Sequence, residues 1–453
     1  MQLYGRKVIY TEYAFIDKSN VVEALYKAIP VFEENKRQID YLYKYFKGDQ
    51  PILNREKQIR SEINNKIVEN RANEIVSFKT GYLMGEPIQY INYGETSVSE
   101  ELNLLNRYMA AENKPSRDSE LAQWFHICGT AYRMALPDAR AEMDEAPFEI
   151  FTLEPDCTFV VYSSGIGHKA LMGVYITTVN NRPHYHVFTD KAKFEICDRK
   201  IIDFRSHILG TIPIIEYPLN NERIGAFEIV IPILDAMNTV ASNRLDGIEQ
   251  FIQALLMLKG VDIETEDFKA LKELGGIKVP VDGDVKYLVQ ELNQMQTQTL
   301  VDYMYQTVLV IVGMPNRNGG TSTSDTGSAV IMRDGWEAAE ARAKLTEPRF
   351  NESEMQFLKL VLNIVNTFRD TELKTSAIQI KFTRRNYQNL LEKVQALTML
   401  LERDDVHPKF AFELSGAFVD PEYAYKISEE YYRTKKAEEL AELNVLNGVH
   451  TDV

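Results

Sequence analysis

The feature that most constrains this chain is a pair of long helical patterns separated by a short segment of different character. Apolar side chains recur near i, i+3 and i+4 spacing over residues 231–258. At about 1.5 Å per residue, a helix of that length would extend roughly 40 Å. Residues 292–313 are helical again and close with Gly313 and Pro315. Because residues 259–291 between them predict one short helix and two short strands, the sequence predicts a two-helix stalk with a small tip.

The rest of the chain is predicted to mix helices and strands. With 453 residues it is too long for one ordinary core, so several domains are expected. From about 147 to 217, short runs rich in Val, Ile, Phe, Tyr and Thr predict a small antiparallel sheet, and PIQYINY predicts a further strand. The helices predicted before that sheet cover residues 20–47, 59–84, 98–112 and 118–135. The fold class of residues 1–223 is therefore α+β.

Downstream of the stalk the patterns are mostly helical. Residues 328–369 form a long amphipathic pattern interrupted by Gly335 and Pro348, where kinks are expected. The run IQIKF, residues 378–382, predicts a lone strand that must pair with a distant part of the chain. Residues 387–447 are predicted to be helical.

A loop of small polar residues joins the stalk to the long amphipathic helix. Between Gly313 and Ala329 the chain reads GMPNRNGGTSTSDTGSA, which offers little apolar surface to bury. Exposed backbone amides at Gly319 and Gly320 could bind a phosphate group. The loop follows a helix rather than a strand, however, and no Lys follows the glycines, so the sequence favours a mobile loop over a nucleotide site.

Charge and cysteine content exclude several classes of protein. The formal charge of −15 disfavours tight binding of nucleic acid, whose affinity comes largely from basic side chains, although weak contact stays open. No 18-residue window is free of charge, and the N-terminus lacks the apolar run of a secretory signal. Three widely spaced cysteines suit free thiols in a reducing cytoplasm. We therefore expect a cytoplasmic protein without a membrane span.

Most enzyme signatures are missing. The sequence contains no GxxxxGK[ST], HExxH, CxxC or GxSxG motif. His184 and His186 in RPHYHVF are predicted to share one face of a strand, but two ligands are too few for a metal site. Cys128 in WFHICGTAY is predicted to be a core residue rather than a nucleophile. No cofactor, no metal and no catalytic residue is therefore predicted.

The order of segments carries more information than any motif. The first informative stretch is NRANEIVSFKTGYLMGEPIQY, in which an Asn-rich helix leads to a Tyr-Leu-x-Gly-x-Pro turn and a strand. The second is LAQWFHICGTAYRMALPD followed by LEPDCTFVVYSS. The third and most specific is HILGTIPIIEYPLNNERIGAFEIVIPILDAMNTVASNRLDGIEQFIQALLMLKG, with matching positions at Pro213, Asn220, Asn221, Asp235, Ser242 and Gly260. On these stretches the chain resembles, over nearly its whole length, the phage portal proteins of the SPP1-like family, which form a ring at one vertex of a tailed-phage capsid.

The resemblance implies a portal fold assembled as a ring of about twelve subunits. The implied parts are an α+β wing (1–223), a stem of two helices (224–258 and 292–313), a small α/β clip (259–291), a tunnel loop (314–327), a long kinked wing helix with a core strand (328–384) and a helical crown (385–453). The ring would be assembled in the host cytoplasm and would lie at the capsid vertex of the virion. Double-stranded DNA would pass through it during packaging and ejection.

The tunnel loop would then face the DNA. Many basic residues would hold phosphate too tightly for a duplex to move, whereas small polar residues offer exchangeable hydrogen bonds without sequence information. The predicted contacts are Asn316, Arg317, Asn318, Gly319, Gly320, Thr321, Ser322, Thr323 and Ser324. Arg317 is the only basic residue of this loop, and the alternative is that it pairs with Asp325 or with a neighbouring subunit.

The clip carries the charged residues predicted to meet partners. These are Asp262, Glu264, Glu266, Asp267, Lys269 and Lys272. The resemblance implies that the clip docks the terminase during packaging and a head-completion adaptor afterwards. Major capsid and scaffolding proteins are further implied partners. The alternative interpretation is a solvated helix with ordinary i, i+3 and i+4 charge pairs.

Two other functions stay open at this stage. One is a cytoplasmic enzyme that binds a small molecule in the β-rich region 147–217, near His184 and His186. The other is a different phage structural piece, such as a capsid-linked adaptor. A conduit should run as a very large ring, whereas a monomer or dimer favours the enzyme.

Overall fold

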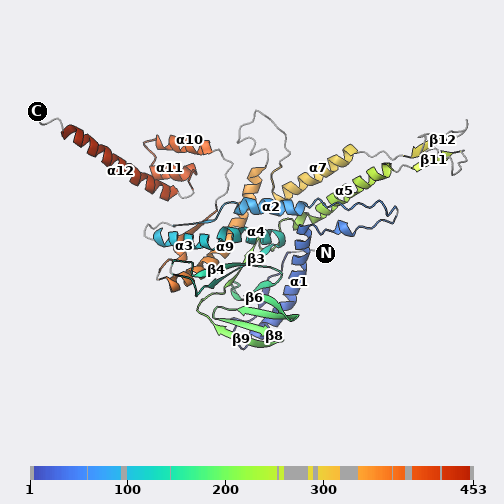
Figure 1. The fold of residues 1–453 in the computed structure, drawn as a ribbon, viewed down its shortest axis with the longest axis horizontal. Helices are drawn as coiled ribbons and strands as arrows, with labels where there is room; N and C mark the ends of the chain where they lie inside the picture. The colour runs from blue at the N-terminus through green and yellow to red at the C-terminus, as the bar shows by residue number, and fades with distance from the viewer. Residues whose placement is uncertain are drawn as a thin grey trace.

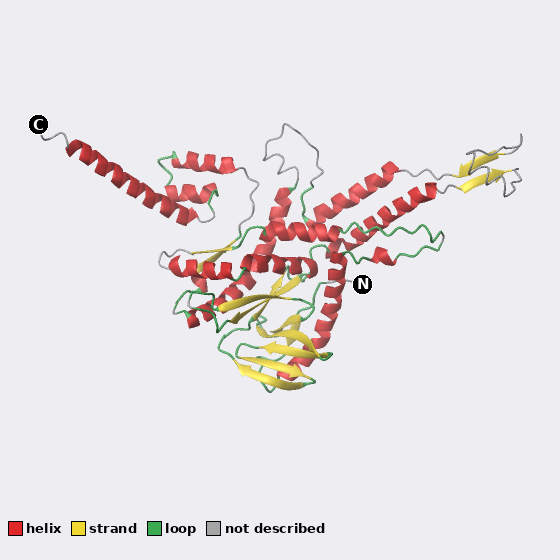
Figure 2. Cartoon of the chain, viewed as in Figure 1, coloured by secondary structure: helices red, strands yellow, loops and turns green. Residues whose placement is uncertain are grey.

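The computed structural model shows an elongated chain in which a central α+β body carries two projections (Figure 1). One projection is a pair of long helices with a small two-stranded tip, and the other is a C-terminal group of helices. Figure 2 shows that the strands gather in the body and at the tip. The structure describes residues 5–58, 60–92, 99–142, 144–252, 255–259, 284–288, 294–316, 335–369, 371–382, 390–418 and 421–448.

Helix α1 (Val21–Lys47) connects two parts of the core. Its first half buries Val21, Leu25 and Phe32 against a sheet, and the Phe32 ring stacks on Phe159 with ring centres 4.5 Å apart. Its second half contributes to the core at the base of the two-helix projection. The helix ends at Gly48, whose φ of 98° is a left-handed conformation that glycine adopts without strain. The predicted helix over 20–47 is confirmed.

A six-stranded sheet packs on the first half of α1. Its spatial order is β1-β5-β6-β7-β8-β9, where only the first pair is parallel. The strands are β1 (Ile9–Thr11), β5 (Thr158–Ser163), β6 (Ala170–Val179), β7 (Arg182–Phe188), β8 (Ala192–Cys197) and β9 (Lys200–Ser206). Strands β5 to β9 follow one another as antiparallel hairpins, since each short polar turn returns the chain beside the strand it has just left.

A separate three-stranded sheet corrects the prediction of one small sheet. Its order is β10-β3-β4, from β10 (Ile214–Pro218), β3 (Thr130–Pro137) and β4 (Phe148–Leu153). Strand β3 also corrects the helix predicted over 118–135, because helix α4 (Lys114–Cys128) ends before it. The reason is that the first six residues of β3 are all buried, so the run lacks the alternation that distinguishes a half-buried strand from a helix.

A third small sheet joins distant parts of the chain. Strand β2 (Gln89–Asn92) pairs antiparallel with β13 (Ile378–Lys381), which confirms that the predicted lone strand pairs far away in the sequence. It lies by helices α3 (Ser99–Ala111) and α9 (Trp336–Phe368), whose apolar residues share one core with α4 and with the three-stranded sheet. Pro348 lies inside α9, but Gly335 precedes its first residue with a φ of 81°, so it is not the predicted kink within the helix.

The two-helix projection, here called the rod, consists of α5 (Ile231–Ile252) and α7 (Gln294–Val312). Its tip is an antiparallel pair, β11 (Leu255–Lys259) with β12 (Asp284–Leu288). The helix predicted to continue to residue 258 therefore ends earlier. The apolar run from Leu255 to Leu258 fits either a helix or a strand, and pairing with the distant β12 decides for the strand.

Two further segments complete the chain. Residues 48–70, here called the arm, contain the short 3₁₀ helix η1 (Pro51–Asn54) and precede α2 (Arg71–Met84). The helix predicted over 59–84 is thus correct only in its second half. The C-terminal group consists of α10 (Leu390–Leu401), α11 (Pro408–Ser415) and α12 (Pro421–Gly448), as the helical pattern over 387–447 predicts. None of the described helices is long and apolar enough to cross a membrane.

Candidate functional site

The base of the rod is built into the body by an apolar core. Leu234 and Met237 of α5 and Val308 and Val312 of α7 are buried together with Tyr45 of α1. The Tyr45 hydroxyl also donates a hydrogen bond of 2.9 Å to the carboxylate of Asp235. A second cross-link joins α7 to α2, where the Tyr305 hydroxyl donates to Glu74 at 2.9 Å. The rod is therefore anchored firmly at one end and projects from the body at the other (Figure 1).

A polar stripe on α5 holds the arm against the rod. Asn238, Ser242 and Asp246 are spaced four residues apart, so they lie on one face of the helix. The Asn238 side-chain oxygen accepts from the backbone amide of Glu69 at 3.0 Å, and the Ser242 hydroxyl accepts from that of Ile67 at 2.9 Å. All three side chains of the stripe are buried by the arm. These contacts satisfy backbone groups of a segment that forms no regular ladder of its own.

Asp246 is the strongest point of this contact. Its carboxylate accepts from the backbone and side-chain nitrogens of Asn65 at 2.8 and 2.9 Å. It also forms ion pairs with Arg55, at 3.1 Å, and with Lys57. Burial opposes the charged form, but the hydrogen bonds from Lys57 and Asn65 outweigh it and lower the pKa of Asp246. Two cations thus fix the arm to one carboxylate of the rod.

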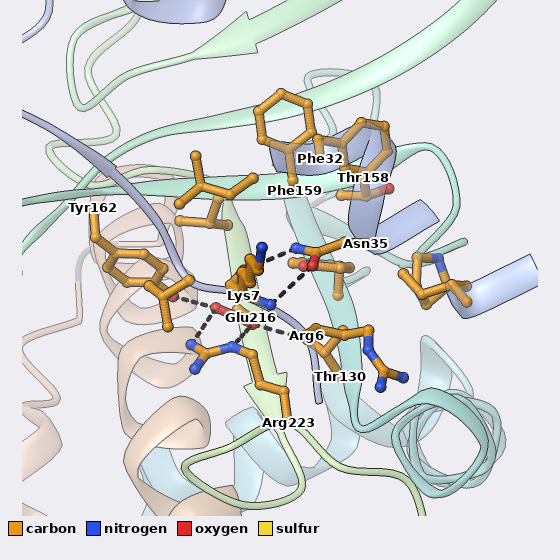
Figure 3. Close-up of a pocket in the computed structure, with 16 residues that line it drawn as sticks. Arg6, Lys7, Phe32, Asn35, Thr130, Thr158, Phe159, Tyr162, Glu216 and Arg223 are labelled. Atoms are coloured by element: carbon orange, nitrogen blue, oxygen red, sulfur yellow. Dashed lines mark hydrogen bonds and ion pairs between the residues drawn. The ribbon is translucent and has the colours of Figure 1, made fainter. Parts of the chain in front are cut away.

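The chain leading into the rod is fixed by a second buried carboxylate, Glu216 of β10. Glu216 accepts from Thr130 at 2.9 Å, from the Tyr162 hydroxyl at 2.6 Å and from Arg223 at 2.6 and 3.0 Å. Figure 3 shows these groups converging on the carboxylate, with Asn35 bonded to the backbone of Lys7 beside them. The cavity that they line has a volume of about 10 Å³. Such a space admits about one water molecule, so the site is a structural junction and not a pocket for a substrate.

An N-terminal contact reinforces this junction. The guanidinium of Arg6 pairs with Glu228 at 2.6 Å and also donates to the backbone oxygen of Cys128 at 3.1 Å. Glu228 in turn accepts from the backbone amide of Gly225 at 2.9 Å. Residues from the first strand region, from the end of α4 and from the start of the rod therefore meet at one buried ion pair.

A third group, here called the buried charge cluster, ties α9 to the body. It consists of Lys114 and Asp118 of α4, Arg133 of β3 and Glu354 of α9. Lys114 lies 2.7 Å from Asp118 and 2.9 Å from Glu354, and Arg133 lies 3.1 Å from Glu354 and also pairs with Asp118. Burial opposes ionisation of Glu354, but Lys114 and Arg133 lower its pKa to about 2. Two positive and two negative groups neutralise one another inside the core.

An open cleft lies where the base of the rod meets α9. It has a volume of about 440 Å³ and is bordered by the end of α7, the chain from Leu219 to Ile229, the first half of α9, and Lys79 and His126. Lys79, Arg342 and Arg349 give it a basic lining. We call it the basic cleft.

The sequence-predicted loop and clip residues fall mostly outside the described residues. Of the predicted loop contacts, only Asn316 is described, and it lies half-buried four residues beyond the end of α7. The predicted contacts outside the described part are Arg317, Asn318, Gly319, Gly320, Thr321, Ser322, Thr323 and Ser324. The predicted clip residues Asp262, Glu264, Glu266, Asp267, Lys269 and Lys272 also lie outside it.

The residues considered for chemistry have other partners. His184 lies 2.8 Å from Glu195 of the next strand, and His186 lies 2.9 Å from Thr177 on the other side. Within the described part of the chain, no three His, Cys, Asp or Glu side chains gather in a way that could hold a metal ion. Cys128 is fully buried, and burial raises its pKa to about 12, so it is a neutral thiol. Its predicted place in the core is confirmed.

Sequence reasoning missed the stripe that holds the arm and the basic cleft. The stripe had a readable signal, since the polar residues opposite the apolar face of 231–258 recur every four positions. The basic cleft had none, because Lys79 and Arg342 are brought together only by the packing of α2 near α9.

A family model matches most of the chain. Residues 27–442 match the family described as phage portal protein, SPP1 Gp6-like. The portal protein of Bacillus phage SPP1 is 24% identical over 195 residues, which cover 42% of this chain and 38% of that relative. The match to this relative therefore spans well under half of its length.

Two solved structures show weaker overall similarity. One is a chain from the neck of an empty GTA particle computed with C6 symmetry, with a TM-score of 0.47 and 13% identity, covering 79% of this chain and 97% of that one. The other is a chain from the virion of a native gene transfer agent particle, with a TM-score of 0.46 and 15% identity, covering 83% and 93%. TM-scores below 0.5 do not by themselves establish a common overall fold.

Proposed function

The chain belongs to the SPP1 Gp6-like family of phage portal proteins, and from this premise we propose that it forms the portal ring at the capsid vertex of a tailed-phage virion. The family is structural rather than enzymatic. In this proposal about twelve copies assemble head to tail into a closed ring. Double-stranded DNA passes along its axis during packaging and ejection. The observation that carries the proposal is the family match over residues 27–442.

The surface of the rod supports assembly with other copies. Met295, Tyr303 and Val310 of α7 are 82%, 67% and 77% exposed in the single chain. Large apolar side chains on one side of a projecting helix are costly in water, and burying each contributes about 1.5–3 kcal/mol. Packing rods side by side around an axis would cover these residues. A ring also explains why the rod can stand away from the body.

The proposed channel contacts are the loop residues 316–324. Small polar side chains can exchange hydrogen bonds with phosphate oxygens as the duplex moves. The chain's net charge of −15 limits the attraction that would otherwise hold DNA in place. Arg317 is the proposed phosphate contact, since it is the only basic residue between Gly313 and Ala329.

The proposed docking surface for other phage proteins is the end of the rod. The two-stranded tip of β11 and β12 lies farthest from the body along the rod (Figure 1). Residues 259–291 would meet the terminase first and a head-completion adaptor later, through Asp262, Glu264, Glu266, Asp267, Lys269 and Lys272. The body and the C-terminal helices would face the major capsid and scaffolding proteins.

Imaging the purified full-length chain tests the proposal. We expect a particle of about twelve subunits in size-exclusion chromatography with light scattering, and rings with a central hole by negative stain. A particle without an axial hole, or a stable monomer, would contradict the proposal. A monomer that binds a small molecule near His184 and His186 would favour the enzyme alternative.

Deleting loop residues 319–326 tests the contact with DNA. We expect the rings to form normally and the packaging of DNA to fall, because the deletion removes polar groups from the channel and leaves the rod intact. Arg317→Ala should have a milder effect that varies with salt concentration. Unchanged packaging by the deletion variant would show that the loop is only a linker.

A further inference from the structure

The basic cleft contains positive charges without negative partners. Among the described residues, neither Lys79 nor Arg342 forms an ion pair, and the Arg342 side chain donates only to the backbone oxygen of Ile311, at 3.4 Å. Burial, and then the charge of Arg342, lower the pKa of Lys79 to about 8. Arg349 differs, because it pairs with Glu352 at 3.0 Å. The cleft thus holds a partly buried ammonium beside an exposed guanidinium that has no ionic partner among the described residues.

The neighbouring groups do not neutralise this charge. His126 is buried next to Lys79, and burial together with Lys79 lowers its pKa well below the usual value, so the ring is neutral. Its Nδ1 atom lies 3.1 Å from the Thr80 hydroxyl. The lining contains one acid, Glu222, which is exposed and forms no ion pair within the described part of the chain. Among the described residues that line the cleft, none pairs a negative charge with Lys79 or Arg342.

The position of Arg342 is fixed by the end of α7. A Cβ atom at Gly313 would lie 2.5 Å from Cγ of Arg342, so the arginine lies directly across this glycine. Gly313 has a φ of 68°, and it lets the chain turn without filling the space that the arginine occupies. The cation is held at the mouth of the cleft by packing and not by a carboxylate.

We propose that the basic cleft receives an Asp or Glu side chain from the adjacent copy of this chain, so that each cleft is completed only in the ring. The inference rests on the proposed ring assembly and deepens it by naming the chemistry of one subunit contact. The adjacent carboxylate would lie between Lys79 and Arg342. A neutral protein side chain would leave both cations without a partner.

The walls of the cleft favour a protein occupant over DNA. Ile229 and Leu345 border the cleft and are 56% and 71% exposed. A phosphate backbone would leave these apolar side chains in contact with water. A protein segment can bury these side chains while its carboxylate meets the cations. The chain itself supplies such segments, with 66 acidic residues against 51 basic ones. Complementary charge between neighbouring copies would also fix their register in the ring.

Charge-removing variants test this contact in the full-length protein. Lys79→Gln and Arg342→Gln should each raise the concentration at which rings dissociate by about tenfold, with a smaller difference at high salt. The unassembled subunit should unfold at the same temperature for Arg342→Gln, whose side chain is exposed, and at the same or a higher temperature for Lys79→Gln, which removes a partly buried charge. The matched control is Lys344→Gln, which removes an exposed cation of the same helix and should change ring dissociation less than about twofold.

The outcomes distinguish a failure of the proposed cleft contact from a failure of the proposed ring assembly. If the wild-type chain forms no ring, the proposed function fails. If rings form and both cleft variants dissociate like the control, the cleft receives no carboxylate. If the variants leave dissociation unchanged but weaken binding of duplex DNA, the cations contact phosphate and the proposal is overturned.

Zero-length cross-linking identifies the partner residue. A carbodiimide joins a lysine amine to a carboxylate in direct contact with it. In rings mixed from ¹⁴N- and ¹⁵N-labelled chains, we expect a cross-link between Lys79 of one copy and an Asp or Glu of another. A Lys79 cross-link found only within one chain would contradict the proposal.

Discussion

The buried charge cluster and the basic cleft pair their charges in opposite ways. In the cluster, Lys114 and Arg133 each contact both Asp118 and Glu354, so every ion has two partners within one chain. In the cleft, Lys79 and Arg342 lie near each other with no described carboxylate between them. Both sites use the same helix, because α9 supplies Arg342 near its start and Glu354 in its second half.

The difference indicates which part of the chain is complete alone. A neutralised cluster fixes α9 in the body whether or not other copies are present, because its charges need nothing from outside. The partly buried ammonium of Lys79 costs free energy in the isolated chain, and an arriving anion would offset that cost. In the proposed ring, the exposed face of the first half of α9 would contact a neighbour, whereas Glu354 ties the second half to the body.

Removing one charge of the buried charge cluster should cause the largest loss of stability. Glu354→Gln leaves two buried cations with one carboxylate, and we expect a loss of about 3–5 kcal/mol in the free energy of unfolding, measured by urea denaturation. The control is Glu352→Gln on the same helix, whose exposed pair with Arg349 should be worth less than about 1 kcal/mol. Equal effects of the two variants would show that the cluster contributes no more than a surface pair.

The cluster also predicts a loss of stability in acid. Glu354 has a pKa of about 2 in the fold against an ordinary value of 4.5, so its contribution is present above the ordinary value and is lost as pH falls toward 2. Glu354→Gln should therefore flatten the dependence of the free energy of unfolding on pH between about 4.5 and 2. An unchanged slope in the variant would contradict this assignment.

The cleft should respond to pH in the same direction as the cluster, but at higher pH and with a smaller size. Lys79 loses its proton near pH 8 in the fold but near 10.5 when unfolded, so the stability of the unassembled subunit should rise with pH between these values. The difference from a Lys79→Met variant should be on the order of 2 kcal/mol across that window. The other basic side chains that line the cleft are Arg342 and Arg349. A difference that falls with pH would show that Lys79 already has a negative partner.

The smallest change in stability is expected on removal of Arg349, the cation of the cleft that already has an acidic partner. Arg349→Gln removes a guanidinium that Glu352 already neutralises, so the free energy of unfolding should change by less than about 1 kcal/mol. Ring dissociation should change less than it does for Arg342→Gln. If Arg349→Gln weakens the ring more than Arg342→Gln, the contrast between paired and unpaired cations does not determine the subunit contact.

Elements with a clear local signal were predictable from the sequence. The helix of residues 20–47 ends at a glycine with positive φ, and the helix before Gly313 ends in the same way. The strand at 378–382 was predicted with an unknown partner, because pairing depends on β2 in a distant part of the chain. The predicted α+β class also agrees with the observed mixture of sheets and helices.

The errors occurred where tertiary contacts override local pattern. Residues 130–135 are buried on both faces of β3, so their sequence does not alternate between apolar and polar residues as a half-buried strand does. The arm at 59–70 has apolar residues at helical spacing, but its backbone groups bond to the polar stripe of α5 instead. The basic cleft could not be predicted at all, since its cations come from elements far apart in sequence.

The pairing of β2 with β13 has a consequence for synthesis of the chain. A ribosome that has made Gln89–Asn92 must still add most of the protein before Ile378–Lys381 can emerge and occupy the free edge. Until then that edge offers unpaired backbone groups to any extended chain nearby. Newly made subunits therefore finish folding late, which delays their readiness to join a growing assembly until translation is nearly over.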